Sequence, residues 1–305
     1  MKFKFWGVRG SIPSPGPRTV RYGGNTTCIE VRSDDGTLIV LDGGTGVFCL
    51  AQALVASGVR PIVAHIFITH SHWDHIHGLP FFTPLFLKDS RVRLHGVTDP
   101  DTGNGIEHVM SVQLQNSYFP VSETQLGATV EYRTLQVGEA FPVGDAVVRN
   151  VVMGHPVTDL GYRIDCQGKS LFFTGDHEPL YNLYPAEHPE HAAFAAHVAQ
   201  RTTAIDELAR GVDALIVDCS YTRDEYPSKR GWGHGTFDSA LAMAMRTGAR
   251  QLYCTHHEPT RSDDELEAVF AEAMARHAGQ LPEHLQVFLA YEGMEVELGE
   301  HPWKN

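Results

Sequence analysis

The sequence has few of the cysteines that a covalently cross-linked fold would need. Its 305 residues include only five, which are scattered singly in apolar stretches: Cys28, Cys49, Cys166, Cys219 and Cys254. An odd number without a pairing pattern argues against a disulfide framework and is typical of reduced, buried thiols in a cytoplasmic protein. We therefore expect a cytoplasmic location and no catalytic cysteine.

Long apolar runs are also missing. No segment approaches the roughly 20 apolar residues that a membrane-spanning helix needs. Residues 1–16 carry three basic side chains and then a run rich in proline, glycine and serine, where a secretory signal would have an apolar stretch. We expect no membrane partner.

Positive charge is scarce as well. Lysine and arginine total 24 against 37 aspartates and glutamates, which gives a formal net charge of −13. A long nucleic-acid footprint needs a cationic stripe that displaces counterions, so we expect none here. A small anionic ligand is still compatible with this charge, because a bound metal cation can attract it locally.

The chain does have enough apolar residues, 42%, to bury a sizeable core. Short apolar runs bounded by turn residues predict strands at 2–8, 26–32, 37–41, 64–69, 130–135, 146–152, 162–166, 170–174, 214–219, 251–255, 285–290 and 294–298. Apolar residues that recur every three or four positions predict helices at 47–57, 188–210, 237–247 and 263–277.

This order of elements is typical of two sheets with helices on their outer faces, an α/β architecture. We interpret residues 1–305 as a single domain, with insertions near 99–125 and 180–197, where no clear period is present. The sequence leaves a homodimer open.

Histidine is the residue in excess, with 18 in the chain. The apolar run 64–69 ends in a cluster that holds His70, His72, Asp74 and His75 within six positions. Burying all four without a cation would leave several polar groups unpaired, at a cost of about 1–3 kcal/mol each. Their spacing directs nitrogen and oxygen ligands into one small volume and suits two adjacent metal ions.

Three further apolar runs end in residues of the same chemical type. His155 follows the run 147–153, Asp176 follows 171–174, and His256 follows 251–255. Four strand ends that offer histidine or aspartate predict one cleft rimmed by loops. Because the donors are nitrogen and oxygen, zinc is the expected metal, and manganese and iron are also compatible.

The pattern His-x-His-x-Asp-His, with a later histidine, an aspartate and a final histidine, resembles that of the metallo-β-lactamase-fold hydrolases. The resemblance runs across nearly the whole chain and implies a four-layer αββα sandwich with a two-metal site at one edge of the sheets. By that pattern Asp176 would bridge the two ions. The other implied ligands are His70, His72 and His155 for the first metal, and Asp74, His75 and His256 for the second.

Within this superfamily the chain is similar to the ribonuclease Z and phosphoribosyl cyclic phosphodiesterase branch. The likeness rests on the glycine-rich segments 7–11, 22–26 and 41–46 and on Gly233-His234-Gly235-Thr236 before a helix. In ribonuclease Z a histidine at that last place works with a glutamate at the end of the preceding strand, where this chain has Asp218. The long arm with which ribonuclease Z grips transfer RNA has no counterpart in the sequence.

The resemblance implies catalytic roles for Asp74, His234 and Asp218. Asp74 would accept a hydrogen bond from the attacking water, and His234 would protonate the leaving oxygen. In the alternative interpretation, the Gly-His-Gly segment is only a loop before a helix that Thr236 caps. The roles of four residues beside proposed ligands stay open between ligand orientation and surface solvation: His177, Glu178, His257 and Glu258.

We therefore expect a binuclear metal-dependent hydrolase that acts on small nucleotide-like or cyclic phosphate diesters. A lactone or carboxyl-ester hydrolase on the same metals is an alternative, because the first histidine cluster cannot separate these reactions. A second alternative is a ligand sensor without activity, although such a protein would be expected to have lost at least one ligand.

Overall fold

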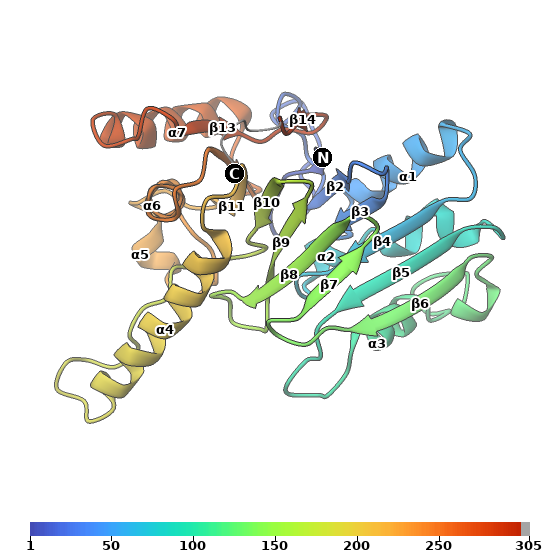
Figure 1. The fold of residues 1–305 in the computed structure, drawn as a ribbon, viewed down its shortest axis with the longest axis horizontal. Coiled ribbons are helices and arrows are strands. Elements are labelled where there is room, and N and C mark those ends of the chain that lie inside the picture. The colour runs from blue at the N-terminus through green and yellow to red at the C-terminus, as the bar shows by residue number, and fades with distance from the viewer. Residues whose placement is uncertain (300–305) are drawn as a thin grey trace.

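The computed structural model describes residues 1–299. Within this range the strands form two seven-stranded sheets, which pack against each other (Figure 1). The first sheet runs in the order β14 (Glu295–Glu297), β1 (Lys2–Gly7), β2 (Cys28–Arg32), β3 (Leu38–Leu41), β4 (Val63–Phe67), β5 (Arg91–Gly96), β6 (Thr129–Thr134). The second runs in the order β13 (Gln286–Leu289), β12 (Gln251–Thr255), β11 (Ala214–Asp218), β10 (Lys169–Phe173), β9 (Leu160–Cys166), β8 (Ala146–Val152), β7 (Ala140–Val143).

The helices connect these strands and cover the outer faces of both sheets. The α-helices are α1 (Gly46–Ala56), α2 (Trp73–Ile76), α3 (Ile106–Gln113), α4 (His191–Ala209), α5 (Tyr226–Lys229), α6 (Phe237–Thr247) and α7 (Asp263–His277). Short 3-10 turns are η1 (Leu79–Phe81), η2 (Thr83–Phe86) and η3 (Glu123–Gln125). None of the helices between residues 1 and 299 combines the length and apolar character needed to cross a bilayer.

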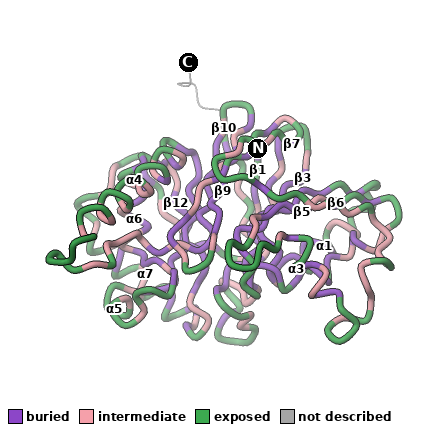
Figure 2. The backbone as a smooth tube through the Cα atoms, turned by 90° about the horizontal axis from the view of Figure 1, so that it is seen from below, coloured by how far each residue is buried: buried purple, intermediate pink, exposed green. Residues whose placement is uncertain are grey.

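Three hydrophobic clusters hold four layers together. One lies between the sheets and takes Phe5 and Ile29 from the first and Ile164 and Ile216 from the second. The other two clusters pack helices α4, α6 and α7 on the second sheet and α1 and α3 on the first. Figure 2 shows these helices on opposite sides of the strands, with the buried backbone concentrated between them. This is the αββα sandwich that the resemblance implies.

Strand direction explains why the candidate ligands meet. Strands β3, β4, β5 and β6 are parallel in the first sheet, and β10, β11, β12 and β13 are parallel in the second. Strand β8 has the same direction as β10, because both are antiparallel to β9. The carboxyl ends of β4, β8, β10, β11 and β12 therefore lie at one edge of the sandwich, which is where open α/β sheets bind ligands.

Most predicted elements agree with the structure within one or two residues. The helices expected at 237–247 and 263–277 coincide with α6 and α7, whose first turns are capped by Thr236 and Ser262. Two strands were not predicted, β5 and β7, although Arg91 to Leu94 in β5 show the alternation of charged and apolar residues that is typical of a half-buried strand. The α4 helix begins at His191, three residues later than expected.

The two segments that lack a sequence period differ in the structure. Residues 99–125 contain α3 and η3, and Ile106, Met110 and Leu114 pack on the first sheet with α1. Residues 180–197 contain an irregular connection and the start of α4, whose buried residues, Ile205 and Ala209, lie near its other end. That residues 1–305 form a single domain with insertions stays a prediction.

Candidate metal centre

The first group of candidate ligands comes from three strand ends. His70 and His72 follow β4, His155 follows β8 and Asp176 follows β10. One ligand atom from each of these four residues lies within 4.8 Å of all the others. The fold therefore brings together the whole set that was assigned by resemblance to the first metal.

The second group shares Asp176 with the first. Asp74 and His75 lie on α2, the short helix that directly follows the first histidines, and His256 follows β12. The Nε2 atoms of His75 and His256 lie 3.2 and 3.1 Å from Asp176 Oδ1, and both also face Asp74 Oδ2, at 3.3 and 3.1 Å. These four residues again place one ligand atom each within 4.8 Å of the others.

The donor set fits divalent cations. In the described part of the chain, the buried atoms His70 Nε2, His75 Nε2 and Asp176 Oδ1 form no well-aligned hydrogen bond, although His75 Nε2 and Asp176 Oδ1 lie 3.2 Å apart. Leaving such atoms unpaired costs about 1–3 kcal/mol each, whereas neutral imidazole nitrogens and carboxylate oxygens are the usual ligands of zinc and similar ions. The residues present therefore match the cations that the resemblance implies.

Buried hydrogen-bond acceptors face the Nδ1 atoms of two ligand histidines and orient their rings. The Nδ1 of His75 lies 2.7 Å from Asp42 Oδ2, and Asp42 also accepts hydrogen bonds from the backbone and hydroxyl of Thr69. The Nδ1 of His70 lies 3.1 Å from Thr69 Oγ1, whereas Asp159 Oδ1, 3.2 Å away, forms no hydrogen bond in the described residues. Such contacts hold the proton on Nδ1 and leave Nε2 to bind metal.

Two further ligand histidines are held by their neighbours. The Nδ1 of His155 lies 3.0 Å from the carbonyl of Gly233, and the Nδ1 of His256 lies 2.9 Å from Ser220 Oγ. Sequence reasoning missed Ser220 and Asp159. Neither carries a signal in the sequence, because each follows or precedes a strand as an ordinary turn residue would.

The protonation of the histidines follows their surroundings. Burial lowers the pKa of His70, His72 and His155, which keeps these rings neutral as metal ligands. Burial also lowers the pKa of His75 and His256, but the surrounding carboxylates, Asp176 above all, outweigh it and raise both values. A cation in this group would replace those protons as the partner of the carboxylates.

His234 faces Asp218 directly. Its Nδ1 lies 2.9 Å from Asp218 Oδ2 and 3.7 Å from Asp176 Oδ2, and its ring stacks on that of His256. Burial lowers its pKa, but Asp218 and Asp176 outweigh this and raise the value to about 9. The aspartate is thus long enough to contact the histidine where ribonuclease Z is expected to have a glutamate. Thr236 also caps α6, as the alternative interpretation of this segment expects.

His177 and Glu178, two of the four residues whose roles the sequence left open, form hydrogen bonds with the backbone around the site. The half-buried His177 accepts a hydrogen bond from the backbone of Gly154, and desolvation of its ring lowers its pKa to about 4. The carboxylate of Glu178 accepts hydrogen bonds from the backbone nitrogens of Gly231 and Gly233. Glu178 therefore holds the loop that carries His234.

The other two open residues have local structural contacts. The Nε2 of His257 lies 2.8 Å from the carbonyl of Ala290, and the ring is fully buried. The Glu258 side chain accepts a hydrogen bond from Thr260 Oγ1 in the turn that follows. Neither belongs to the groups of candidate ligands in the described residues.

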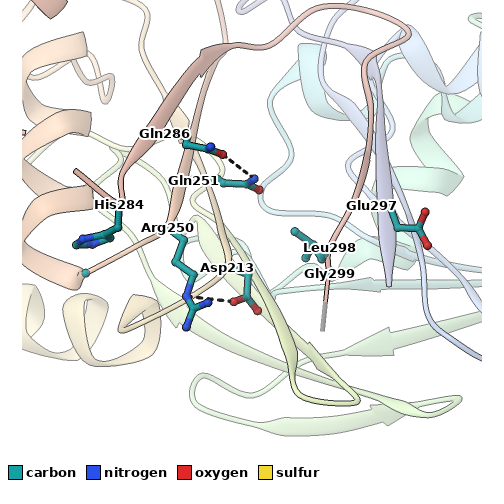
Figure 3. A pocket seen from close by; sticks show the side chains of 9 residues that line it. Asp213, Arg250, Gln251, His284, Gln286, Glu297, Leu298 and Gly299 are labelled. Carbon is teal, nitrogen blue, oxygen red and sulfur yellow. Dashed lines mark hydrogen bonds and ion pairs between the residues drawn. The ribbon is translucent and has the colours of Figure 1, made fainter. Parts of the chain in front are cut away.

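A cavity of about 580 Å³ lies at the other end of the second sheet. Figure 3 shows it at the amino ends of β11, β12 and β13, with Arg250 directed to Asp213 and Gln251 to Gln286. Because its polar side chains are already paired with one another and it lies away from the carboxyl edge, we do not connect it with the chemistry.

A family model described as "Beta-lactamase superfamily domain" matches residues 37–257, more than half of the chain. Ribonuclease Z of Haloarcula marismortui is 24% identical over 326 residues and covers 97% of this chain and 96% of its own. Ribonuclease Z of Lacticaseibacillus casei is 27% identical over 289 residues and covers 84% of both chains. The similarity confirms the branch to which the motifs pointed.

Solved structures share the fold at low identity. YhfI of Bacillus subtilis, described as a metallo-beta-lactamase fold protein, gives a TM-score of 0.66 at 19% identity, covering 97% of this chain and 99% of its own. Human tRNase Z, short form, gives 0.63 at 17% identity, with 98% and 100% covered. A diphosphatase from the PhnP family gives 0.62 at 19%, with 98% of both chains covered.

The relatives overturn one expectation. We expected no long nucleic-acid footprint from the net charge of −13, but relatives that match nearly the whole chain are named ribonucleases. Net charge averages over the entire surface, whereas the attraction of a phosphate to a metal centre is decided within a Debye length of about 8–10 Å. An acidic chain is therefore no argument against RNA at this site. By its family match and its relatives, the chain belongs to the beta-lactamase superfamily and is a metal-dependent hydrolase.

Proposed function

We propose that this hydrolase uses two divalent ions, with zinc expected, to cleave phosphodiester bonds, and that small nucleotide-like or cyclic phosphate diesters are among its substrates. One observation carries the proposal: the Asp176 carboxylate joins two groups of candidate ligands and lies 3.7 Å from His234, which itself contacts Asp218. The relatives named ribonuclease Z support phosphodiester chemistry. The unpaired cysteines support a cytoplasmic location.

The residues that would hold the ions are those of the two groups. His70, His72 and His155 would hold one ion and Asp74, His75 and His256 the other, with Asp176 shared by both. When bound, two such ions lower the pKa of water and neutralise charge on the phosphoryl oxygens. Asp42 and the Thr69 hydroxyl keep the imidazoles of His75 and His70 in the tautomer that can ligate.

Two side chains are placed to handle protons. The Asp74 carboxylate, oriented by the backbone nitrogen of Ser11 at 2.8 Å, can accept a hydrogen bond from the attacking water. Because His234 directs Nδ1 to Asp218, its Nε2 is left for the leaving oxygen. A raised pKa keeps the His234 ring protonated near neutral pH, as a general acid requires.

Metal analysis followed by a substrate screen tests the proposal. Purified protein should contain about two transition-metal ions per chain and hydrolyse bis(p-nitrophenyl) phosphate and 2′,3′-cyclic nucleotides. Precursor transfer RNA, a lactone and a phosphomonoester complete the screen. The His284→Ala variant serves as a control, because His284 is exposed and lines the distant cavity.

The outcomes separate the alternatives. Turnover of the lactone without turnover of any phosphodiester would favour the carboxyl-ester hydrolase. A protein that takes up no transition metal and turns over no substrate would contradict both the two-metal site and the phosphodiesterase. Cleavage of RNA in addition to small diesters agrees with the proposal, whereas cleavage of RNA alone would refute its small-diester part.

A further inference from the structure

A second cavity adjoins the candidate metal centre. It has a volume of about 450 Å³ and lies between α4 and the loops after β8 and β10. His155, a candidate ligand, forms part of its wall. We call it the α4 hollow and define it by residues 154–156, 178–181, 183 and 231 and the α4 side chains of Phe194, His197, Val198 and Arg201.

The wall of the α4 hollow is largely apolar. Pro156, Leu180 and Leu183 face it from the loops, and Phe194 and Val198 from the helix. Leu183 is 65% exposed. Figure 1 shows the amino-terminal part of α4 and the loop before it projecting beyond the second sheet. Apolar groups gathered next to a polar metal site are typical of a substrate pocket.

Arg201 supplies a positive charge to the same wall. Its guanidinium donates a hydrogen bond to the carbonyl of Met153, at 2.7 Å, two residues before His155. Among the residues that the structure describes, no carboxylate lies within 4.0 Å of this half-buried cation. Arg246, by contrast, forms an ion pair with Asp206, also on α4. Burial lowers the Arg201 pKa without compensation, so an anionic ligand would be favoured there.

The acidic residue of the hollow is already engaged. The Glu178 carboxylate accepts hydrogen bonds from the backbone of Gly231 and Gly233 and from the hydroxyl of Tyr226. The neighbouring cavity on the other side of Arg201, of about 520 Å³, is lined by Asp99 and Asp101. An anion beside Arg201 is therefore better accommodated in the α4 hollow than in that cavity.

We propose that the α4 hollow binds a nucleotide of the substrate, with the base against Leu183 and Phe194 and a phosphate that is not cleaved on Arg201. The inference rests on the proposed function, because it takes the scissile diester to lie at the metal centre beside His155. A flat base suits an apolar wall with an aromatic ring, and a guanidinium binds phosphate through paired hydrogen bonds.

Binding to the metal-free protein tests the pocket without catalysis. The probes are adenosine 3′,5′-bisphosphate and adenosine, titrated by calorimetry. Arg201→Met should weaken binding of the bisphosphate by about tenfold or more and change that of adenosine much less. Leu183→Ser should weaken both. Arg210→Met, at the end of the same helix and exposed, is the matched control and should change neither.

Hydrolysis by the metal-loaded enzyme provides the second test. The substrates are the dinucleotide ApA, the same dinucleotide with a 5′-phosphate, and bis(p-nitrophenyl) phosphate, which has neither base nor second phosphate. The loss of kcat/KM in Arg201→Met should be about tenfold greater for the phosphorylated dinucleotide than for ApA, chiefly through KM. Precursor transfer RNA as a fourth substrate shows whether the nucleotide comes from RNA or from a small diester.

Equal losses on every substrate would overturn the inference, because they would mean that Arg201 only supports the Met153 loop. Unchanged bisphosphate affinity in Arg201→Met would also overturn it. If the wild type cleaves no phosphodiester but still binds the bisphosphate through Arg201, the proposed function fails and the nucleotide pocket stands. Hydrolysis of bis(p-nitrophenyl) phosphate without discrimination between the dinucleotides refutes the pocket alone.

Discussion

Asp176 is the residue on which the candidate site depends most. Its two carboxylate oxygens face His75 and His256 at 3.2 and 3.1 Å, and His70 at 3.6 Å. Those histidines come from both sheets of the sandwich, so this one side chain links the two halves of the centre. Burial alone would raise the pKa of the Asp176 carboxyl, but the positive charge of His256, His75 and His234 outweighs it and holds the pKa well below the usual range.

Replacing Asp176 with asparagine should reduce the content of both metal ions, because one shared negative charge disappears from two groups of ligands. The expected loss of affinity is about 10–100-fold or more, measured by elemental analysis after dialysis against a weak chelator. The exposed Asp89→Asn is the control and should keep its metal. Full occupancy in Asp176→Asn would contradict the bridging role.

Replacing His234 with alanine should separate proton transfer from metal binding. The metal content should stay unchanged, while kcat on a diester with a poor alkoxide leaving group falls by about a hundredfold or more. A nitrophenolate leaves without a proton, so its release should suffer much less. Asp218→Asn should show the same trend in weaker form, since Asp218 raises the His234 pKa and orients the ring. Equal losses on both substrates would show that His234 positions substrate instead.

At the scale of elements, the loop between α5 and α6 serves both metal binding and the proposed proton transfer. Gly233 has a φ of +88°, and a Cβ at this position would come within 2.2 Å of His155 Nδ1. The Gly233 carbonyl accepts a hydrogen bond from His155 Nδ1, and the Gly233 backbone N–H donates one to the Glu178 carboxylate. The loop thus orients a candidate metal ligand and carries His234 at the same time.

Gly233→Ala should therefore weaken metal binding and lower activity, although residue 233 itself is no ligand. A side chain would strain the backbone and displace either His155 or the loop, at a cost of about 1–3 kcal/mol. Metal affinity and kcat of Gly233→Ala, compared with Gly279→Ala, test this, because a Cβ at Gly279 meets no atom within 4 Å. Wild-type metal affinity in Gly233→Ala would show that the close approach is not required.

At the scale of the whole molecule, two histidines are buried between the sheets. His65 on β4 and His95 on β5 stack with ring centroids 5.4 Å apart, and His95 also stacks on Phe67 at 4.2 Å. Burial lowers their pKa values to about 4 and about 3, and each ring is further disfavoured as a cation by nearby arginines. Both histidines therefore serve in packing and not as metal ligands of the candidate site.

These values predict acid sensitivity of the fold. In the unfolded chain both histidines would titrate near pH 6.5, so below that pH the unfolded state binds protons that the folded state does not. The free energy of unfolding should therefore fall as the pH falls from about 6.5 towards 4. His95→Phe, which keeps an aromatic ring beside Phe67, should make this decline shallower in urea titrations at fixed metal content. The exposed His284→Ala should retain the wild-type slope.

The architecture could be predicted where the local pattern is strong. Helices α6 and α7 follow from regular apolar spacing and from caps that the sequence displays, Thr236 and Ser262. Strand β5 was missed although its charged and apolar residues alternate as in a half-buried strand, because the alternation spans only Arg91 to Leu94 and so short a pattern is a weak signal. The four-layer fold was predicted from the family resemblance as well as from the order of strands and helices, and the family match confirms it.

The residues of the candidate site also divide into those that the sequence predicts and those that only the structure reveals. The sequence by itself determined which side chains can serve as ligands, because His70, His72, Asp74 and His75 lie within six positions after one strand, so that local backbone geometry alone keeps them together. Only the tertiary structure decided which distant groups complete the site. Asp159 and Ser220 approach the ligand histidines from the ends of β9 and β11, and Arg201 on α4 contacts Met153 after β8. Contacts between residues so far apart in the chain depend on how the sheets and helices pack.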